Sequence, residues 1–136
     1  MIPVFVDTSA FVALADGRDG NHGAARRCLR RLGRDRRPLV TSTDVLDELL
    51  TLLRVRVGHA AAVAAGRSLF ETRWCRLVEI GPETRAAAWE LFVRFDDHVF
   101  SFTDCTSFAL MRAMQIVEAF TFDRRDFSTM GFSPRP

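Results

Sequence analysis

The sequence contains no lysine, and all 19 of its basic residues are arginine. A Walker A loop needs a lysine to reach the nucleotide phosphates. Response-regulator receivers and phosphoaspartate phosphatases also depend on a lysine. The absence of lysine therefore excludes these classes of phosphate-handling protein.

Cysteine and histidine are few and scattered. Cys28, Cys75 and Cys105 are odd in number, lie far apart and form no CxxC pair. This arrangement indicates neither a disulfide framework nor a thiolate zinc site, so we expect three buried free thiols. The three histidines also lack the spacing of metal ligands.

Long apolar runs are absent too. No segment approaches the ~20 apolar residues that span a bilayer, and the N-terminus lacks the pattern of a cleaved signal peptide. We therefore expect a cytoplasmic protein with no membrane partner. The 136 residues are 48% hydrophobic and 26% charged, without repeats or linker-like segments. This composition predicts one domain over residues 1–136.

Short apolar segments alternate with amphipathic ones along the chain. Residues 2–6 are rich in β-branched and aromatic residues and predict a strand buried on both faces. Further strands are expected at residues 38–41, 77–80, 116–122 and, at an edge, 132–134. After a first helix that includes Phe11, helices are expected over residues 22–33, 43–57, 60–73, 83–95 and from about residue 103. Such alternation predicts an α/β fold with a mainly parallel sheet of four or five strands and helices on both faces.

Helix starts and faces can also be predicted. The helix over residues 83–95 is expected to bury an apolar face of Ala86, Trp89, Leu91, Phe92 and Val93. Hydroxyl residues are candidate N-caps for three helices. The candidates are Thr8 or Ser9 for the first, Thr41, Ser42 or Thr43 for the second, and Ser101 or Thr103 for the third.

Four acidic residues stand where an α/β sheet exposes its chemistry, at the carboxyl ends of its strands. Asp7 and Asp123 follow directly after predicted strands. Glu48 lies at the edge of the apolar arc of its helix, and Asp104 lies on the inward face of another helix near its start. If the sheet forms as predicted, the four carboxylates converge on one cleft. For Asp7 a helix N-cap, and for Asp104 a favourable helix dipole, are alternative explanations.

A cluster of four carboxylates needs a counter-charge. Two like charges 4 Å apart repel by about 4 kcal/mol at an intermediate dielectric. A bound cation removes this repulsion, and ligands that are all oxygen select hard ions such as Mg²⁺ or Mn²⁺. Such an ion is suited to phosphodiester hydrolysis, because it can activate water and stabilise charge on the leaving oxygen.

Arginines are concentrated near the N-terminus. Eight of them lie between Arg18 and Arg37, opposed only by Asp19 and Asp35. This segment is either a solvated helix face or a surface that faces phosphates, because arginine binds phosphate in a bidentate manner.

The motifs around these acids carry a family resemblance. They are residues 4–9 (VFVDTS), 47–49 (DEL), 101–104 (SFTD), 120–123 (FTFD) and 125–127 (RDF). In their order, spacing and total length the chain resembles the PIN-domain family, specifically the VapC-type toxins of bacterial type II toxin–antitoxin systems. The resemblance implies a three-layer αβα sandwich and a Mg²⁺-dependent endoribonuclease, with Mn²⁺ as a substitute ion. It also implies an RNA substrate, a homodimer and a cognate VapB-like antitoxin that blocks the acidic pocket.

The resemblance also implies roles for individual residues. Asp7, Glu48 and Asp104 would be the core metal-binding and catalytic acids, and Asp123 the fourth. We expect Asp7 and Asp104 to ligate the first ion, directly or through water, with Glu48 holding a water near the line of attack. Asp123 would complete the shell or assist a second ion. Supporting roles are implied for Thr8, Ser9, Thr121 and Asp126.

Two other functions fit the same residues. The chain is alternatively a metal-dependent nuclease acting on DNA or structured RNA, which matched RNA and DNA substrates would distinguish. It is alternatively a non-catalytic RNA-binding module of the same fold, which would show no Mg²⁺-linked thermal stabilisation.

Overall fold

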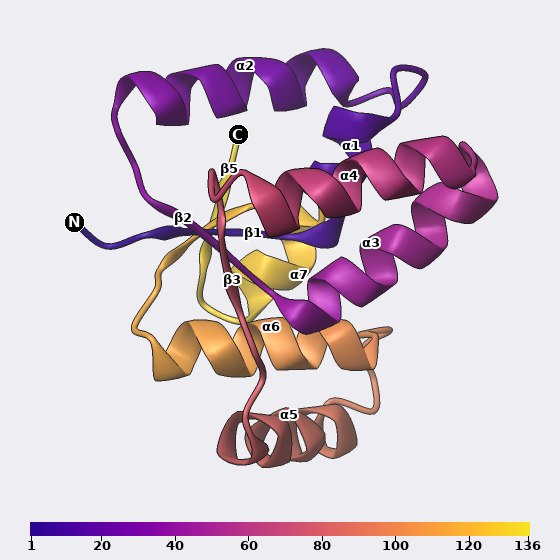
Figure 1. Cartoon of the computed structure of the whole chain (residues 1–136). Helices are drawn as coiled ribbons and strands as arrows, with labels where there is room; N and C mark the ends of the chain where they lie inside the picture. Colours follow the sequence, from indigo (N-terminus) through magenta and orange to yellow (C-terminus); the bar gives the residue numbers. More distant parts are fainter.

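A five-stranded parallel sheet organises the computed structural model, which describes residues 1–136 (Figure 1). The strands are β1 (Val4–Val6), β2 (Leu39–Ser42), β3 (Arg76–Val78), β4 (Glu118–Phe120) and β5 (Ser133–Arg135). Their order is β3–β2–β1–β4–β5, and every pairing is parallel. The carboxyl ends of all five strands therefore share one edge of the sheet.

The central strand has the character that the sequence predicts. All three residues of β1 are apolar and fully buried, because helices cover both faces of the sheet. The predicted strands lie in the right places, although three of the five are predicted longer than the observed strands and the other two are offset by one residue. The fifth strand, predicted as a short edge strand, pairs with β4 in the register Ala119↔Pro134.

Seven helices surround the sheet. They are α1 (Thr8–Ala15), α2 (His22–Arg34), α3 (Thr43–Arg56), α4 (His59–Glu71), α5 (Pro82–Arg94), α6 (Phe102–Ala113) and α7 (Arg124–Thr129). In Figure 1, α1, α2 and α4 lie on one side of the sheet and α5, α6 and α7 on the other, while α3 contacts both α1 and α6. This three-layer arrangement confirms the predicted αβα fold class.

For α3 and α6, the N-cap is one of the candidate residues that the sequence predicts. The Ser42 hydroxyl accepts a hydrogen bond from the Val45 amide at 3.0 Å at the start of α3. Ser101 caps α6 in a reciprocal capping box with Asp104. The prediction for the first helix is wrong, since α1 begins one residue earlier and Asp7 stands at its N-cap position. Asp7 makes no side-chain capping bond there, because its carboxylate is engaged elsewhere.

The predicted buried face of α5 is mostly wrong. Of its five expected residues only Leu91 is buried, while Trp89, Phe92 and Val93 are exposed. Helix α5 is the outer helix of its layer and packs chiefly on α6, so only a narrow stripe of it is covered (Figure 1). The stacked rings of Trp89 and Phe92 lie beside this stripe, with their centroids 5.9 Å apart.

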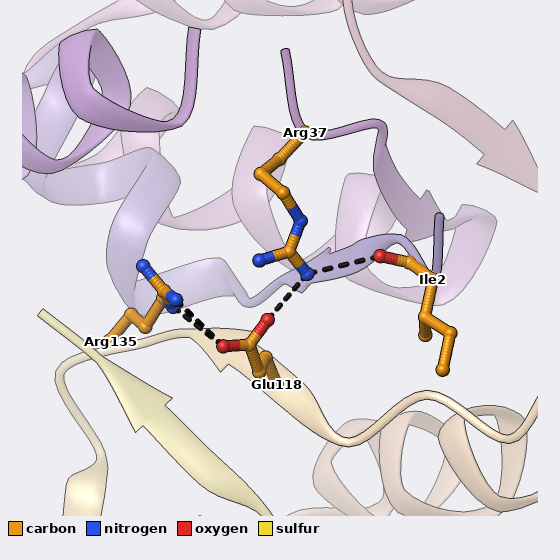
Figure 2. A network of polar contacts seen from close by, with 4 residues as sticks. All are labelled: Ile2, Arg37, Glu118 and Arg135. Atoms are coloured by element: carbon orange, nitrogen blue, oxygen red, sulfur yellow. Dashed lines mark hydrogen bonds and ion pairs between the residues drawn. The ribbon is translucent and has the colours of Figure 1, made fainter. Parts of the chain in front are cut away.

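A polar network joins the two ends of the chain to the sheet (Figure 2). The Glu118 carboxylate, at the start of β4, accepts two hydrogen bonds from Arg135 at 2.8 and 3.0 Å and one from Arg37. The same Arg37 guanidinium donates to the Ile2 carbonyl at 3.0 Å. One half-buried carboxylate thus connects the N-terminal segment, the entry to β2 and the C-terminal strand.

The remaining structural predictions concern membranes and thiols. No helix combines the length and the apolar character that crossing a bilayer requires. All three cysteines are free and buried, as predicted.

Candidate active site

The carboxyl edge of the sheet brings together the four acids singled out by the sequence. Asp7 directly follows β1, and Asp123 lies three residues after the end of β4. Glu48 projects from the second turn of α3, and Asp104 from the first turn of α6. Each of Asp7, Asp104 and Asp123 has its pKa raised by the charge of at least one other member of the four. The four carboxylates therefore lie within electrostatic range of one another.

Asp7 is the most deeply buried of the four, with 2% of its surface exposed. Its Oδ2 atom accepts hydrogen bonds from the hydroxyls of Ser9 and Thr121, both at 2.8 Å. Desolvation raises the pKa of Asp7 to about 6, although both hydroxyl bonds oppose the rise and Asp104 adds to it. Burial without a cation thus makes the charged form of Asp7 less favourable than that of an aspartate in water.

The two hydroxyls also connect the start of α1 to the segment after β4. Ser9 Oγ accepts a hydrogen bond from the Phe122 amide at 2.9 Å, and Thr121 Oγ1 accepts one from the Asp123 amide at 3.0 Å. Asp7 and Asp123 are therefore held in fixed relation, although they are 116 positions apart in the sequence. Ser9 and Thr121 were both predicted as supporting residues, and these bonds give them a positioning geometry.

Asp104 is oriented by the end of its own helix. Its Oδ2 atom accepts a hydrogen bond from the Ser101 amide at 2.9 Å, and its own amide donates to the Ser101 hydroxyl at 3.0 Å. Desolvation raises the pKa of Asp104 to about 6, and the charges of Glu48 and Asp123 add to the rise. Asp104 thus lies in the first turn of α6, as the helix-dipole explanation requires, yet neither the dipole nor the capping box keeps its pKa at the ordinary value.

Asp123 lines the same cavity as Glu48. Desolvation raises its pKa to about 6, and the charges of Asp7, Asp126 and Glu48 act in the same direction, as does a hydrogen bond with the Asp7 carboxyl. Asp126 lies in the first turn of α7 and is half-buried. Asp126 thus contributes to the field at Asp123, and it belongs to the same acidic environment.

A cavity of about 310 Å³ opens beside these acids. Its walls include Glu48, Asp123 and Ser9, together with Arg56 as its one basic residue and Phe122 as its aromatic one. The hydroxyl of Thr8, which also lines this cavity, is buried and has no hydrogen-bond partner. Such buried hydroxyls without a partner are uncommon in native structures. A larger cavity of about 950 Å³ lies between α2 and α4, but no acid lines it.

Sequence reasoning missed three polar residues of this cavity, Asp19, Asn21 and Arg56. Arg56 follows Glu48 and Leu52 at intervals of four on α3, so helical spacing alone places all three on one face. The signal was hidden because Arg56 is one of 19 arginines. Asn21 lies in the turn before α2, where no periodicity predicts the direction of a side chain.

No basic side chain is paired with any of the four acids. None of Asp7, Glu48, Asp104 or Asp123 forms an ion pair within 4.0 Å, although the chain contains 19 arginines. No three histidine, cysteine, aspartate or glutamate side chains are close enough together to ligate one ion directly. A donor set of this kind fits a hard, hydrated cation, which typically takes one or two carboxylates directly and keeps several waters.

Comparison with known proteins agrees with this geometry. Residues 4–133 match the PIN domain family. The chain belongs to the PIN domain family. PIN-domain nucleases generally use divalent metal ions, which is consistent with the uncompensated acids of this PIN domain.

Individual relatives of this PIN domain are similar over nearly their whole length. The 23S rRNA-specific endonuclease VapC20 of Mycobacterium tuberculosis is 44% identical over 130 residues, which are 95% of each chain. The crystal structure of this sarcin–ricin loop cleaving toxin matches with a TM-score of 0.85 at 42% identity, covering 98% of this chain and 99% of that one. The toxin–antitoxin complex VapBC from Salmonella typhimurium, solved bound to DNA, matches with a TM-score of 0.70 at 13% identity over 99% and 98% of the two chains. At that identity the last match shows the fold alone.

Proposed function

We propose that this PIN domain is a metal-dependent endoribonuclease toxin that hydrolyses phosphodiester bonds in RNA. The observation that carries the proposal is the group of four carboxylates without a counter-charge at the carboxyl edge of the sheet. The 44% identity to a 23S rRNA-specific endonuclease supports RNA rather than another phosphodiester as the substrate.

The metal is proposed to be Mg²⁺, with Mn²⁺ as a functional substitute. Asp7 and Asp123, which Thr121 links through its hydrogen bonds to the Asp7 carboxylate and the Asp123 amide, are proposed to hold the ion most directly. Asp104 and Glu48 are proposed to act at greater distance, through water. When bound, the ion supplies a Lewis acid that activates water and stabilises negative charge on the leaving oxygen.

The protein residues are proposed to position the reacting groups. Ser9 and Thr121 hold Asp7 Oδ2 through their hydroxyl hydrogen bonds. Glu48, half-buried on the cleft wall, accepts the proton of the attacking water at its carboxylate. Arg56, on the same face of α3, contacts a phosphate of the RNA beside the cleaved bond. Thr8 is proposed to support the site from the wall of the cavity.

The substrate is proposed to be 23S rRNA, cleaved in the sarcin–ricin loop as the name of the related toxin states. Residues 1–136 are proposed to act as one nuclease domain in the cytoplasm, where ribosomes are found. A VapB-like antitoxin is the proposed inhibitor, and a homodimer is the proposed form of the toxin. The fold that this chain shares with a VapBC complex is consistent with an antitoxin partner.

One experiment tests this proposal. Purified protein is incubated with total bacterial RNA and intact ribosomes in Mg²⁺ or in EDTA, in parallel with the variant Asp7→Asn. The expected result is a discrete 23S rRNA fragment with wild-type protein and Mg²⁺, and at least a ~100-fold slower cut with the variant or EDTA. Asp47→Asn, which changes an exposed acid next to Glu48, is the matched control and should cut like wild type. A fully active Asp7→Asn protein would contradict the proposal.

DNA of matched sequence is included in the same assay. Cleavage of DNA at a rate similar to that of RNA would favour a less selective metal nuclease. RNA binding without any cleavage, and without stabilisation by Mg²⁺, would favour a non-catalytic module.

A further inference from the structure

Helix α2 carries a surface that the proposed active site does not use. Four of its arginines, Arg27, Arg30, Arg31 and Arg34, surround a shallow cavity of about 360 Å³ that no other residue lines. We call these four residues the arginine face. At 100° per residue they fall within an arc of about 100°, opposite the buried stripe of the helix. The arginine face is therefore directed outward, away from the sheet.

The charges of the arginine face are not satisfied within the protein. None of the four guanidinium groups forms an ion pair within 4.0 Å. The four residues also form like-charge pairs at spacings of three and four, which destabilise an isolated helix. The helix dipole favours only Arg31 and Arg34, in the last turn. An external anion would turn this repulsion into attraction.

The position of α2 connects the arginine face to the cleft. The turn before α2 contributes Asp19 and Asn21 to the cavity beside the acids, so the helix starts at the cleft. From there α2 runs back across one side of the sheet, away from that edge (Figure 1). A nucleic acid that enters the cleft and continues along α2 meets the arginine face outside the acidic region.

Arginines at these spacings suit a regular phosphate backbone. Residues three and four apart on a helix have their Cβ atoms about 5–6 Å apart, which is comparable to the separation of successive phosphates along a strand. Arginine adds bidentate contacts to phosphate oxygens. Double-stranded RNA is recognised largely through its backbone, whereas unpaired loops are read through their bases. A base-paired stem presents its phosphates in a fixed array, so a rigid helix can match them without ordering the RNA.

We propose that the arginine face of α2 binds the phosphates of the base-paired stem next to the cleaved loop, and so directs the nuclease to hairpin RNA. This inference rests on the proposed RNA substrate. The acidic cleft repels phosphate, and the arginine face supplies the attraction that holds the RNA over it. The contribution is to binding of the stem, and the face takes no part in cleavage of the bond.

The binding test compares two variants with equal loss of charge. The first replaces Arg27, Arg30, Arg31 and Arg34 with Gln. The control replaces Arg67, Arg73, Arg76 and Arg112, which are exposed, form no ion pair and do not line the acidic cavity, with Gln. Binding is measured by fluorescence anisotropy in EDTA, where no cleavage occurs. The probes are a labelled sarcin–ricin hairpin and a linear RNA containing only its loop sequence.

For the hairpin we expect about tenfold weaker binding by the first variant, and a change in the slope of log K against log salt of roughly 2–3. The linear RNA should bind the first variant and wild type equally, and the control variant should bind both RNAs like wild type. In Mg²⁺, the first variant should show a higher KM for the hairpin with kcat unchanged. Circular dichroism should show that both variants are folded. If the fourfold variant is unfolded, the pairs Arg27→Gln/Arg31→Gln and Arg30→Gln/Arg34→Gln are measured instead.

Three results would overturn the inference. Hairpin binding and salt slope equal to wild type would remove the arginine face from RNA binding. Equal losses on hairpin and linear RNA would remove its assignment to the stem. The fourfold variant is also co-expressed with the antitoxin and purified. If it no longer co-purifies with the antitoxin but binds RNA like wild type, the arginine face is assigned to a protein partner. Failure of the proposed function is distinguished from all three, because wild-type protein would then fail to cut the hairpin while its binding is still measured.

Discussion

At the scale of single residues, Asp7 shows that burial in this site disfavours the charged form of a carboxyl group. The residue is buried, and two hydroxyls donate hydrogen bonds to the same oxygen of its carboxylate. Hydroxyl bonds lower the pKa of a carboxyl, yet desolvation outweighs them and raises that of Asp7 to about 6. A bound cation would stabilise the charged form of Asp7, and the two hydroxyls would then orient its carboxylate toward the ion.

Replacement of Thr121 by Val tests this positioning role. The change removes the hydroxyl that donates to Asp7 and accepts from the Asp123 amide, while side-chain volume is nearly conserved. Loss of an outer hydrogen bond to a metal-binding group typically reduces metal affinity by about 10–100-fold. We therefore expect the Mg²⁺ concentration for half-maximal cleavage to rise by about that factor.

The matched control for Thr121→Val is Thr41→Val. Thr41 is also fully buried, and its hydroxyl donates to the Val6 carbonyl at 2.8 Å without contacting an acid. Both variants lose a buried hydrogen bond, so both should be destabilised by about 1–3 kcal/mol. Only Thr121→Val should change the Mg²⁺ requirement, and an equal change in the two variants would assign Thr121 a purely structural role.

At the scale of elements, the sequence predicts the helices and strands that have a periodic apolar pattern, and it does not predict the shortest helix. Alternating apolar and amphipathic segments predict all five strands and six of the helices, because each buries a repeated stripe. Helix α7 has only six residues, too few for a repeat, and it was not predicted. On α5 apolar residues occupy several faces, so the pattern does not show which face meets α6.

In the candidate site, too, local patterns predict some features and not others. Its four acids could be selected from the sequence because strand ends and helix faces have predictable directions, and the structure brings them into one electrostatic environment. Their roles as ligands and catalysts stay predictions. The cross-connections of Ser9 and Thr121 depend on pairs more than 100 positions apart, which no local pattern encodes.

Replacement of Ser101 by Ala tests the capping box of α6. The Ser101 hydroxyl accepts from the Asp104 amide at 3.0 Å, so its loss leaves a helix donor without its partner. We expect a loss of about 1 kcal/mol in the free energy of unfolding, measured by urea denaturation. Cleavage should also slow, because Asp104 is oriented by the same box. Thr103→Ala, the alternative cap that the structure does not use, should leave both quantities nearly unchanged.

At the scale of the whole molecule, the paired carboxylate of Glu118 and the unpaired carboxylates of the site have opposite effects on the free energy of unfolding at neutral pH. Glu118 is paired with Arg37 and Arg135 and joins both termini to the sheet. Desolvation raises its pKa, but the hydrogen bonds and charges of the two arginines together lower it below the ordinary value of 4.5. The acids at the other edge of the sheet have no such partners, and their pKa values are raised.

Glu118→Gln tests the stabilising group. A charged hydrogen-bond network of this exposure contributes about 1–2 kcal/mol, so the variant should unfold at a correspondingly lower urea concentration at pH 7. Because the folded state lowers the pKa, this contribution is present above pH 4.5 and is lost as pH falls through the folded value. The difference between variant and wild type should therefore shrink below pH 4.5. The exposed Glu90→Gln should show no difference at either pH.

The unpaired acids give the opposite pH dependence. The pKa values of Asp7, Asp104 and Asp123 rise from 3.8 to about 6 on folding, so the folded state binds protons more tightly than the unfolded state. Their effect alone lowers the stability of the metal-free protein as pH rises from about 3.8 to about 6. Above that range all three are charged, and a divalent cation can replace the lost protons.

We therefore expect Mg²⁺ to raise the melting temperature at pH 7.5 and to have little effect at pH 5, where protons occupy the carboxyls. At a concentration 100 times the Kd the gain is about 2.7 kcal/mol, which a thermal melt resolves easily. Asp7→Asn should raise the melting temperature of the metal-free protein at pH 7.5 and largely remove the response to Mg²⁺, because a buried charge and a ligand are lost together. Equal stabilisation by Mg²⁺ at both pH values, or in Asp7→Asn, would mean that the ion binds elsewhere on the protein and that these carboxylates do not form its site.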